Sequence, residues 1–169
     1  MIDSLISEDN SELEEDTMKD LYLLFCIEDR TYGLELQYMI EIISYQKITE
    51  IDNMPAYVKG VINLRGKIIP VIDVRLRFHR QQKEYNKFTC FIIIKLENLV
   101  SGIIVDTVQD IIKIPKKNIE ATPSFGNSEE TWCIDNLGKV EDKVIMILNL
   151  DNFIHYKDME TISTAIQKE

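Results

Sequence analysis

The sequence predicts a mainly β protein built from two similar small units, and three observations lead to this fold class. Short apolar runs rich in Ile and Val recur along the chain and are separated by turn residues. The segment YGLELQYMIEIIS (32–44) shares its pattern with SGIIVDTVQDIIK (101–113). KIIPVIDV (67–74) likewise matches KVIMILNL (143–150). These repeats indicate two β-units of about 65–75 residues, each a small barrel or sandwich, with chance similarity between apolar strands as the alternative.

The first elements follow from apolar runs and turn residues. LYLLFCIEDRTYGLEL (21–36) predicts a hairpin, because one apolar run ends at the polar turn EDR and a second begins at Tyr32-Gly33. YMIEIISYQKI (38–48) has apolar residues at helical spacing followed by β-branched ones, so helix and strand both remain open. Pro55 then breaks whatever precedes it, and the surrounding segment is a connector.

The stretch GVINLRGKIIPVIDV (60–74) predicts a second hairpin. Arg65-Gly66 forms its tight turn, since Gly66 can supply the positive φ that a two-residue turn needs. Pro70 interrupts the returning strand and cannot donate to a β-ladder. The strand must therefore be an edge at Pro70 or carry a bulge, as a small barrel allows.

The segment FTCFIIIKLENLVSGIIVDTVQDIIKI (88–114) predicts a third hairpin, which turns at Glu97-Asn98. Both alternating faces of its first strand are largely apolar, so that strand is expected to be buried on both sides at a seam between subdomains. KKNIEATPSFGNSEET (116–131) has the composition of a loop, and KVIMILNLDNFI (143–154) that of a last strand. The final residues, 157–169, are expected to form a short helix or tail.

Charge and composition exclude several classes of protein. The net charge is −10, and residues 1–20 hold eight of the acids but one base, so the rest of the chain is nearly balanced. We expect this acidic segment to be solvated and disordered. An acidic chain without a basic stripe is a poor nucleic-acid binder. No apolar run approaches the roughly 20 residues of a membrane span, and no basic leader precedes an apolar core. Three widely spaced cysteines fit a reducing cytoplasm.

The patterns of enzymes are also missing from the sequence. The six glycines form neither a dinucleotide-binding nor a P-loop fingerprint, and His79 and His155 adjoin no nucleophile pattern. Metal-binding spacings are absent. We therefore expect no catalysis, no cofactor and no metal. Arg65 is the remaining signal, either as a solvated turn residue or as a recognition arginine beside an apolar surface.

VKGVINLRGKIIPVIDVRLRF (58–78) closely resembles the signature stretch of the CheW family of chemotaxis coupling proteins. The resemblance runs from about Leu21 to Ile154 and includes YGLEL, EII, NLRG, PVID and SGIIVDTVQDI. It implies an all-β fold of two SH3-like five-stranded barrels that share a core between them, with short helices including a C-terminal one. The family-like domain would span 21–156, with subdomains at roughly 21–85 and 86–156 that could exchange strands.

The resemblance also implies a non-enzymatic adaptor. Family members couple the cytoplasmic tips of transmembrane chemoreceptors to the regulatory domain of the histidine kinase CheA, and can self-associate in rings. Such a protein would be cytoplasmic, would not insert into the membrane, and would be recruited to receptor arrays. The alternatives are a small-ligand or enzymatic β-barrel and a scaffold for another receptor-kinase pathway.

Carried onto this sequence, the arginine of NLRG corresponds to Arg65 and its acidic partner to Glu41. Positions that line the receptor side correspond to Met39, Gly60, Asn63, Cys90 and Gly102. For the two glycines the alternative is backbone geometry, and for Met39 and Cys90 it is ordinary core packing. The chain departs from the family in its long acidic lead-in and in Asn136, which stands where a glycine is usual. Asn tolerates the left-handed conformation, so a turn there could survive.

Overall fold

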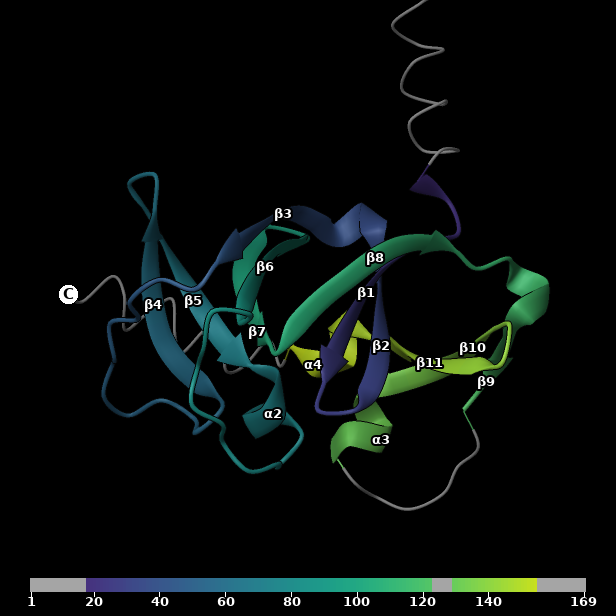
Figure 1. Ribbon diagram of the computed structural model, residues 1–169. Coiled ribbons are helices and arrows are strands. Elements are labelled where there is room, and N and C mark those ends of the chain that lie inside the picture. The colour runs from purple at the N-terminus through teal and green to yellow at the C-terminus, as the bar shows by residue number, and fades with distance from the viewer. Residues whose placement is uncertain (1–17, 123–128, 155–169) are drawn as a thin grey trace, which may run out of the picture.

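The structure, a computed structural model, describes residues 18–122 and 129–154. The predicted acidic segment, apart from residues 18–20, and the predicted C-terminal helix or tail lie outside the described residues. Within the described part, eleven strands form two sheets (Figure 1). Their bounds are β1 Leu21–Ile27, β2 Arg30–Glu35, β3 Met39–Ser44, β4 Val58–Leu64, β5 Lys67–Asp73, β6 Cys90–Leu96, β7 Leu99–Val105, β8 Thr107–Lys113, β9 Ile119–Ala121, β10 Ile134–Val140 and β11 Lys143–Leu148.

Short helical turns join these strands. Their bounds are η1 Leu36–Tyr38, α2 Val74–Arg77, η2 Lys116–Asn118, α3 Glu129–Cys133 and α4 Leu150–Phe153. The predicted hairpins at β1–β2, β4–β5 and β6–β7 are confirmed. The ambiguous segment 38–48 forms strand β3. The loop predicted at 116–131 is wrong in part, because η2, β9 and α3 occupy much of it.

The internal repeat is real and extends to the strand bounds. Adding the offset of 69 residues to β1 gives the bounds of β6, and adding 76 to β4 gives those of β10. The same offset of 76 converts α2 into α4. Asp73 caps α2 by accepting a hydrogen bond from the Arg75 N–H, and its counterpart Asn149 caps α4 by accepting one from the Asn152 N–H. The mainly β fold class predicted from these repeats is confirmed.

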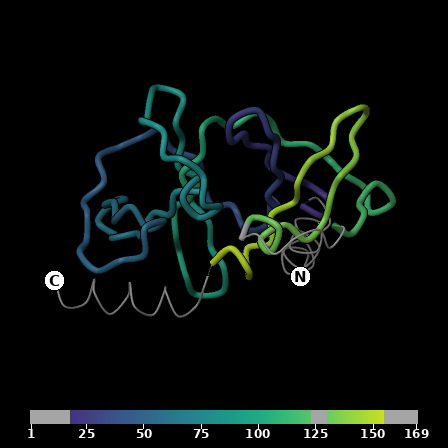
Figure 2. The backbone as a smooth tube through the Cα atoms, turned by 90° about the horizontal axis from the view of Figure 1, so that it is seen from below, coloured from purple at the N-terminus to yellow at the C-terminus, as the bar shows by residue number. Residues whose placement is uncertain are grey.

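The two repeats exchange hairpins. The six-stranded sheet has the order β8-β1-β2-β11-β10-β9, and the five-stranded sheet has the order β3-β6-β7-β5-β4. The first hairpin of each repeat, β1–β2 or β6–β7, therefore lies among the later strands of the other repeat. Figure 2 shows this exchange from below, with the purple N-terminal hairpin among green and yellow strands. Two parallel pairings, β5 with β7 and β11 with β2, join the exchanged parts. The sheets thus combine strands from both halves of the chain.

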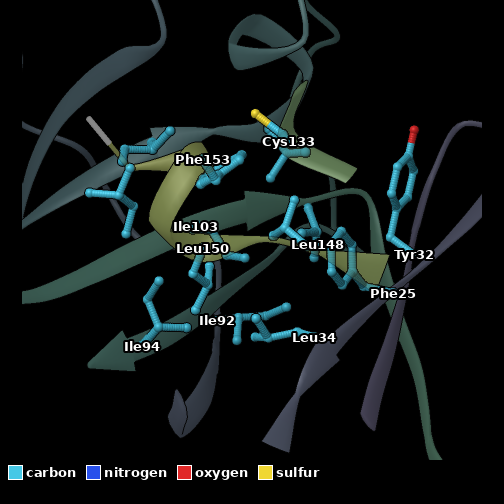
Figure 3. Close-up of a cluster of buried hydrophobic side chains, with 14 of the residues drawn as sticks. Phe25, Tyr32, Leu34, Ile92, Ile94, Ile103, Cys133, Leu148, Leu150 and Phe153 are labelled. Carbon is cyan, nitrogen blue, oxygen red and sulfur yellow. The ribbon is translucent and has the colours of Figure 1, made fainter. Parts of the chain in front are cut away.

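Each sheet curls around an apolar cluster of its own, and a third, larger cluster lies between the sheets. The five-stranded barrel encloses Ile62, Ile69, Val71, Phe91, Ile93 and Ile104. The six-stranded barrel encloses Tyr22, Leu24, Ile114, Ile145 and Ile147. Figure 3 shows part of the cluster between them, which includes Phe25, Leu34, Ile92, Ile103, Leu148 and Phe153. This arrangement is two SH3-like barrels with a shared core; β9 adds a short sixth strand to one sheet.

Strand β6 lies at the seam, as its sequence predicts. Phe91 and Ile93 point into the five-stranded barrel, whereas Ile92 and Ile94 belong to the core between the barrels. Pro70 is also explained. Strand β5 pairs with β4 along its length, but its ladder with β7 begins only at Val71, so Pro70 lies where that side of the strand has no β7 partner.

The expectation for Asn136 is wrong in one respect. Asn136 corresponds to Gly60 in the repeat, and the strands β4 and β10 carry register shifts at these equivalent places, Val58/Gly60 and Ile134/Asn136. Gly60 has a φ of 146°, but Asn136 is not among the residues with positive φ. The second barrel therefore forms its bulge without the left-handed conformation.

Candidate partner-binding site

The predicted recognition arginine lies at the tip of the β4–β5 hairpin. Arg65 has a φ of 51° and Gly66 a φ of 84°, the pattern of a type I′ turn. The Asn63 side-chain oxygen accepts a hydrogen bond from the Gly66 N–H at 2.8 Å, which fixes the turn. Asn63, predicted to line the receptor side, thus holds the loop that presents Arg65.

Arg65 and Glu41 meet in a two-point ion pair. Arg65 Nη1 donates to Glu41 Oε1 at 2.8 Å and Nη2 donates to Oε2 at 2.6 Å. The arginine side chain is 73% exposed, and that of Glu41 is 23% exposed. The hydrogen bonds from Arg65 lower the pKa of Glu41, and those same bonds raise the pKa of Arg65. Both groups are therefore charged at neutral pH, and the cation faces outward where a partner can reach it.

Exposed aliphatic side chains lie on the two elements that carry this ion pair. Ile40 and Ile42 flank Glu41 on β3 and are 49% and 38% exposed, and Ile68 on β5 is 43% exposed. Sequence reasoning missed these residues. The repeat could have found them, because it matches Ile42 with Ile111 and Ile68 with Val144, and the matched residues are also exposed in the other barrel. Because side chains alternate along a strand, Ile40 and Ile42 point to the face of β3 opposite Glu41, so they are near the ion pair in sequence but do not surround it.

Met39 and Cys90 are half-buried and pack against the core between the barrels. Met39 pairs with Ile94 across β3 and β6, while Cys90 pairs with Ser44 at the other end of the same ladder. The Cys90 thiol donates to the Phe88 carbonyl at 3.3 Å, and burial raises the pKa of this thiol. Core packing accounts for these contacts, and the exposed part of each side chain remains available to a partner.

The two predicted glycines are buried and shape the five-stranded barrel. A Cβ on Gly60 would lie 2.1 Å from the Thr49 carbonyl oxygen, and one on Gly102 would lie 2.9 Å from a Val71 methyl carbon. Gly60 lets the connector bridge to β4, and Gly102 lets β5, β6 and β7 pack closely. Backbone geometry is thus a sufficient reason for Gly60, and close packing between strands for Gly102.

A network of charges that sequence reasoning missed joins the barrels. Arg75 on α2 bonds Asp106, which lies where the chain passes from β7 to β8 and from one sheet to the other. Arg75 also bonds Glu28 Oε1 at 3.0 Å, and the Glu28 N–H donates to Asp106 Oδ2 at 2.8 Å. Glu28 belongs to the β1–β2 turn of the other sheet. These contacts clamp the crossover between the two sheets.

Other kinds of site find little support in the described part of the chain. A cavity lined by Asp73, Arg75, Tyr85 and Asp106 has a volume of about 10 Å³, room for a single water, whereas ligand pockets occupy roughly 300–1,000 Å³. The described residues hold no cluster of three or more His, Cys, Asp or Glu side chains placed to bind a metal. Nor do they include a helix of the length and apolarity that crossing a bilayer requires.

Comparison with known proteins places this geometry in a family. The family model for the CheW-like domain matches residues 21–158. The chain belongs to the CheW-like family. It is 30% identical to the chemotaxis protein CheW of Klebsiella aerogenes over 155 residues, covering 92% of this chain and 93% of that protein. It is 28% identical to the chemotaxis protein CheW of Bacillus subtilis, covering 85% and 90%.

A solved structure agrees with the fold as well as the family. The crystal structure of the scaffolding protein TtCheW from Thermoanaerobacter tengcongensis superimposes with a TM-score of 0.74 and 33% sequence identity. The match covers 79% of this chain and 91% of that one. The family resemblance and the two-barrel fold that the sequence predicts are therefore confirmed.

Proposed function

We propose that this chain couples the cytoplasmic tips of transmembrane chemoreceptors to the regulatory domain of the histidine kinase CheA. Membership of the CheW-like family supports the broader role of an adaptor in chemotaxis signalling. The finer assignment of partners rests on the resemblance of the NLRG and EI motifs and on the surface that these motifs build. In this role the chain acts by binding alone, works in the cytoplasm, and reaches the membrane through its receptors.

The observation that carries the proposal is the exposed Arg65–Glu41 ion pair at the tip of the β4–β5 hairpin. A solvated ion pair adds little to folding stability, because water already satisfies both charges. The glycine turn and Asn63 nevertheless hold Arg65 in one place. An arginine that is fixed by its turn and exposed can act as an interface hot spot once a partner desolvates it. A helical receptor tip that docks there would desolvate the guanidinium.

Binding and stability measured on the same sample test the assignment. The Arg65→Ala variant should bind a receptor-tip fragment at least roughly 30-fold more weakly, with little change in its denaturation midpoint. Lys139→Ala is the matched control, because it removes another exposed ion pair, with Glu120 at 2.7 Å, from the other barrel. That control should bind the receptor tip normally.

A double-mutant cycle adds the Glu41→Ala change. Alone it should weaken binding less than Arg65→Ala, and the two effects should be coupled because the side chains touch. Normal binding by Arg65→Ala together with a large loss of stability would make Arg65 a structural residue. Failure of the unaltered chain to bind either receptor tips or the CheA regulatory domain would overturn the proposed function itself.

A further inference from the structure

Three side chains of the first repeat surround the carboxylate of Glu130, which belongs to α3 in the second repeat. Arg80, which follows α2, donates from Nη2 to Glu130 Oε1 at 2.8 Å and to Oε2 at 2.9 Å. The Tyr32 hydroxyl on β2 donates to Oε1, and Arg30 Nη1 donates to the same oxygen at 3.4 Å. The arginine–tyrosine site is Arg30, Tyr32 and Arg80. It holds a carboxylate by charge and by several hydrogen bonds at once, the strong form of carboxylate recognition.

Contacts that do not involve Glu130 keep this site in shape. The Tyr32 ring is buried and lies 5.6 Å from the Phe78 ring, centroid to centroid. The Arg80 side chain is 14% exposed, and the Arg80 N–H donates to the Arg75 carbonyl at 2.8 Å. Burial raises the pKa of Tyr32, and the hydrogen bond to Glu130 raises it further, so the hydroxyl stays protonated as a donor. The donors are therefore preorganised, as a binding site requires.

The charges around the site balance only while Glu130 is in place. In the part of the chain that the structure describes, the ion pairs connected to the site join three cations to three anions. They are Arg30, Arg75, Arg80, Glu28, Asp106 and Glu130. Removing the Glu130 carboxylate leaves three arginines with two carboxylates. An uncompensated charge on a largely buried arginine is costly, so the vacated site attracts an anion.

Glu130 links α3 to the first repeat, whereas the other end of this helix is anchored in the second. Helix α3 packs on α4 and leads into β10, both of its own repeat. Cys133, at the end of α3, is fully buried, and its carbonyl accepts a hydrogen bond from the Asn149 N–H at 2.7 Å. Trp132 beside it is 48% exposed. Lifting the first turn of α3 would break the bonds of Glu130 and bring solvent to Cys133.

We propose that the arginine–tyrosine site binds carboxylates, and that α3 is a latch that closes the site by placing Glu130 in it. The covalent connection gives Glu130 an effective concentration in the millimolar range or above, so the closed state excludes dilute carboxylates. When α3 lifts, the site is open to an acidic side chain of a partner protein. Helix α3 and the tip of the β4–β5 hairpin lie far apart (Figure 1), so the latch does not depend on the partners proposed for Arg65.

The accessibility of Cys133 measures whether the latch opens. Under native conditions Glu130→Ala should react with iodoacetamide at Cys133 about tenfold faster than the unaltered chain, the factor that loss of one charge-assisted hydrogen bond corresponds to. Rates at the half-buried Cys26 and Cys90 should not change, which distinguishes local opening from general unfolding. Glu120→Ala is the matched control, because it removes a carboxylate from an exposed ion pair elsewhere. An unchanged Cys133 rate in Glu130→Ala would overturn the latch.

Acetate tests the site itself, because it has the carbon and oxygen atoms that Glu130→Ala removes. The thermal midpoint of Glu130→Ala should be at least about 2 °C higher in sodium acetate than in sodium chloride at the same concentration, since a ligand of the folded chain stabilises it. The unaltered chain in the same two salts gives the general effect of acetate on stability, which is subtracted. Equal corrected midpoints would mean that the site binds no carboxylate.

Two further variants locate the effect. Glu130→Gln retains the volume of the side chain without its charge, so Cys133 should react faster than in the unaltered chain while acetate has no effect on the midpoint. This variant also tests the latch if Glu130→Ala fails to fold. In Arg80→Ala/Glu130→Ala the response to acetate should disappear, because the main donor to the carboxylate is gone. A response that survives in this double variant would place acetate elsewhere and refute the arginine–tyrosine site.

Discussion

Arg65 adopts a backbone conformation that its residue type disfavours. Its φ of 51° lies in the left-handed region, where a Cβ is crowded and only glycine is free of cost. Arg65→Ala and Arg65→Gly remove the same guanidinium, so both should lose receptor-tip binding equally. The glycine variant should have the higher midpoint in denaturant, because it alone relieves the backbone. A glycine variant less stable than the alanine variant would contradict this account.

Asp106 should make stability depend on pH in the acid range. Burial alone would raise the pKa of this carboxyl group, but hydrogen bonds from Arg75 and the Glu28 N–H outweigh it and lower the pKa below the usual 3.8. Because the folded pKa is the lower one, the stabilisation is complete above the unfolded pKa. It is lost as pH falls through the folded value.

Asp106→Asn should remove this dependence and lower stability at pH 7 by roughly 1.5–3 kcal/mol, since it weakens bonds to a largely buried arginine. Urea unfolding between pH 2 and 7 measures both effects. Asp52→Asn, a change at an exposed connector residue, is the control and should leave the pH profile intact. An Asp106→Asn profile parallel to that of the unaltered chain would refute the assignment.

At this scale the sequence shows local constraints better than distant contacts. Gly66 and Pro70 have conformational requirements of their own, so the turn and the edge position followed directly from them. The Arg65–Glu41 pair followed only from the family resemblance. Arg75 and Asp106 are 31 residues apart, and nothing in the sequence near either marks the other as its partner.

Among the elements, the β4–β5 hairpin allows a comparison of two glycines with different needs. An added Cβ on Gly66 meets nothing within 4 Å, so Gly66→Ala should cost about 1–2 kcal/mol through its φ of 84° alone. Gly60→Ala should cost more, about 3 kcal/mol or above, because the Cβ would also meet the Thr49 backbone. Denaturant unfolding of both variants checks the order. Equal losses would mean that the connector moves aside freely.

Elements whose sequence patterns are ambiguous take their conformation from strands that are distant in sequence. The burial of β3 alternates regularly, but its sequence looks helical because the exposed positions, Ile40 and Ile42, are apolar too. Strand β9 lies in a segment with the composition of a loop and pairs with β10 over three residues. Pairing with a neighbouring strand, rather than local propensity, decides the conformation of such short pieces.

For the whole molecule, the repeat predicted two units but could not assign strands to sheets. Both repeats have the same order of apolar runs, so an arrangement without exchange would satisfy the same pattern. The choice depends on the shared core, in which Ile92 and Ile103 from one repeat meet Phe25 and Leu34 from the other. Such contacts form only in the complete chain, and they follow from packing rather than from periodicity.

Exchange and a shared core should make the two barrels unfold together. If one sheet unfolded alone, the core between the barrels would be exposed. Each sheet also contains a two-stranded hairpin from the other repeat, so a half-folded state is costly. Trp132 on α3, the single tryptophan, reports on the six-stranded side. Phe91 is fully buried inside the five-stranded barrel. Phe91→Leu should therefore lower the midpoint seen by Trp132 fluorescence, by an amount corresponding to about 1 kcal/mol.

Amide exchange of β4 and β5 in mild denaturant provides the second probe, and it should give the same free energy of unfolding as the fluorescence. Val144→Ala is the control, since this side chain is 57% exposed on β11 and its loss should shift neither probe much. If the barrels were independent, Phe91→Leu would change exchange in β4 and β5 and leave the Trp132 transition where it was. The exchanged hairpins argue against that outcome, because β6, the strand that carries Phe91, also contributes Ile92 and Ile94 to the core between the barrels.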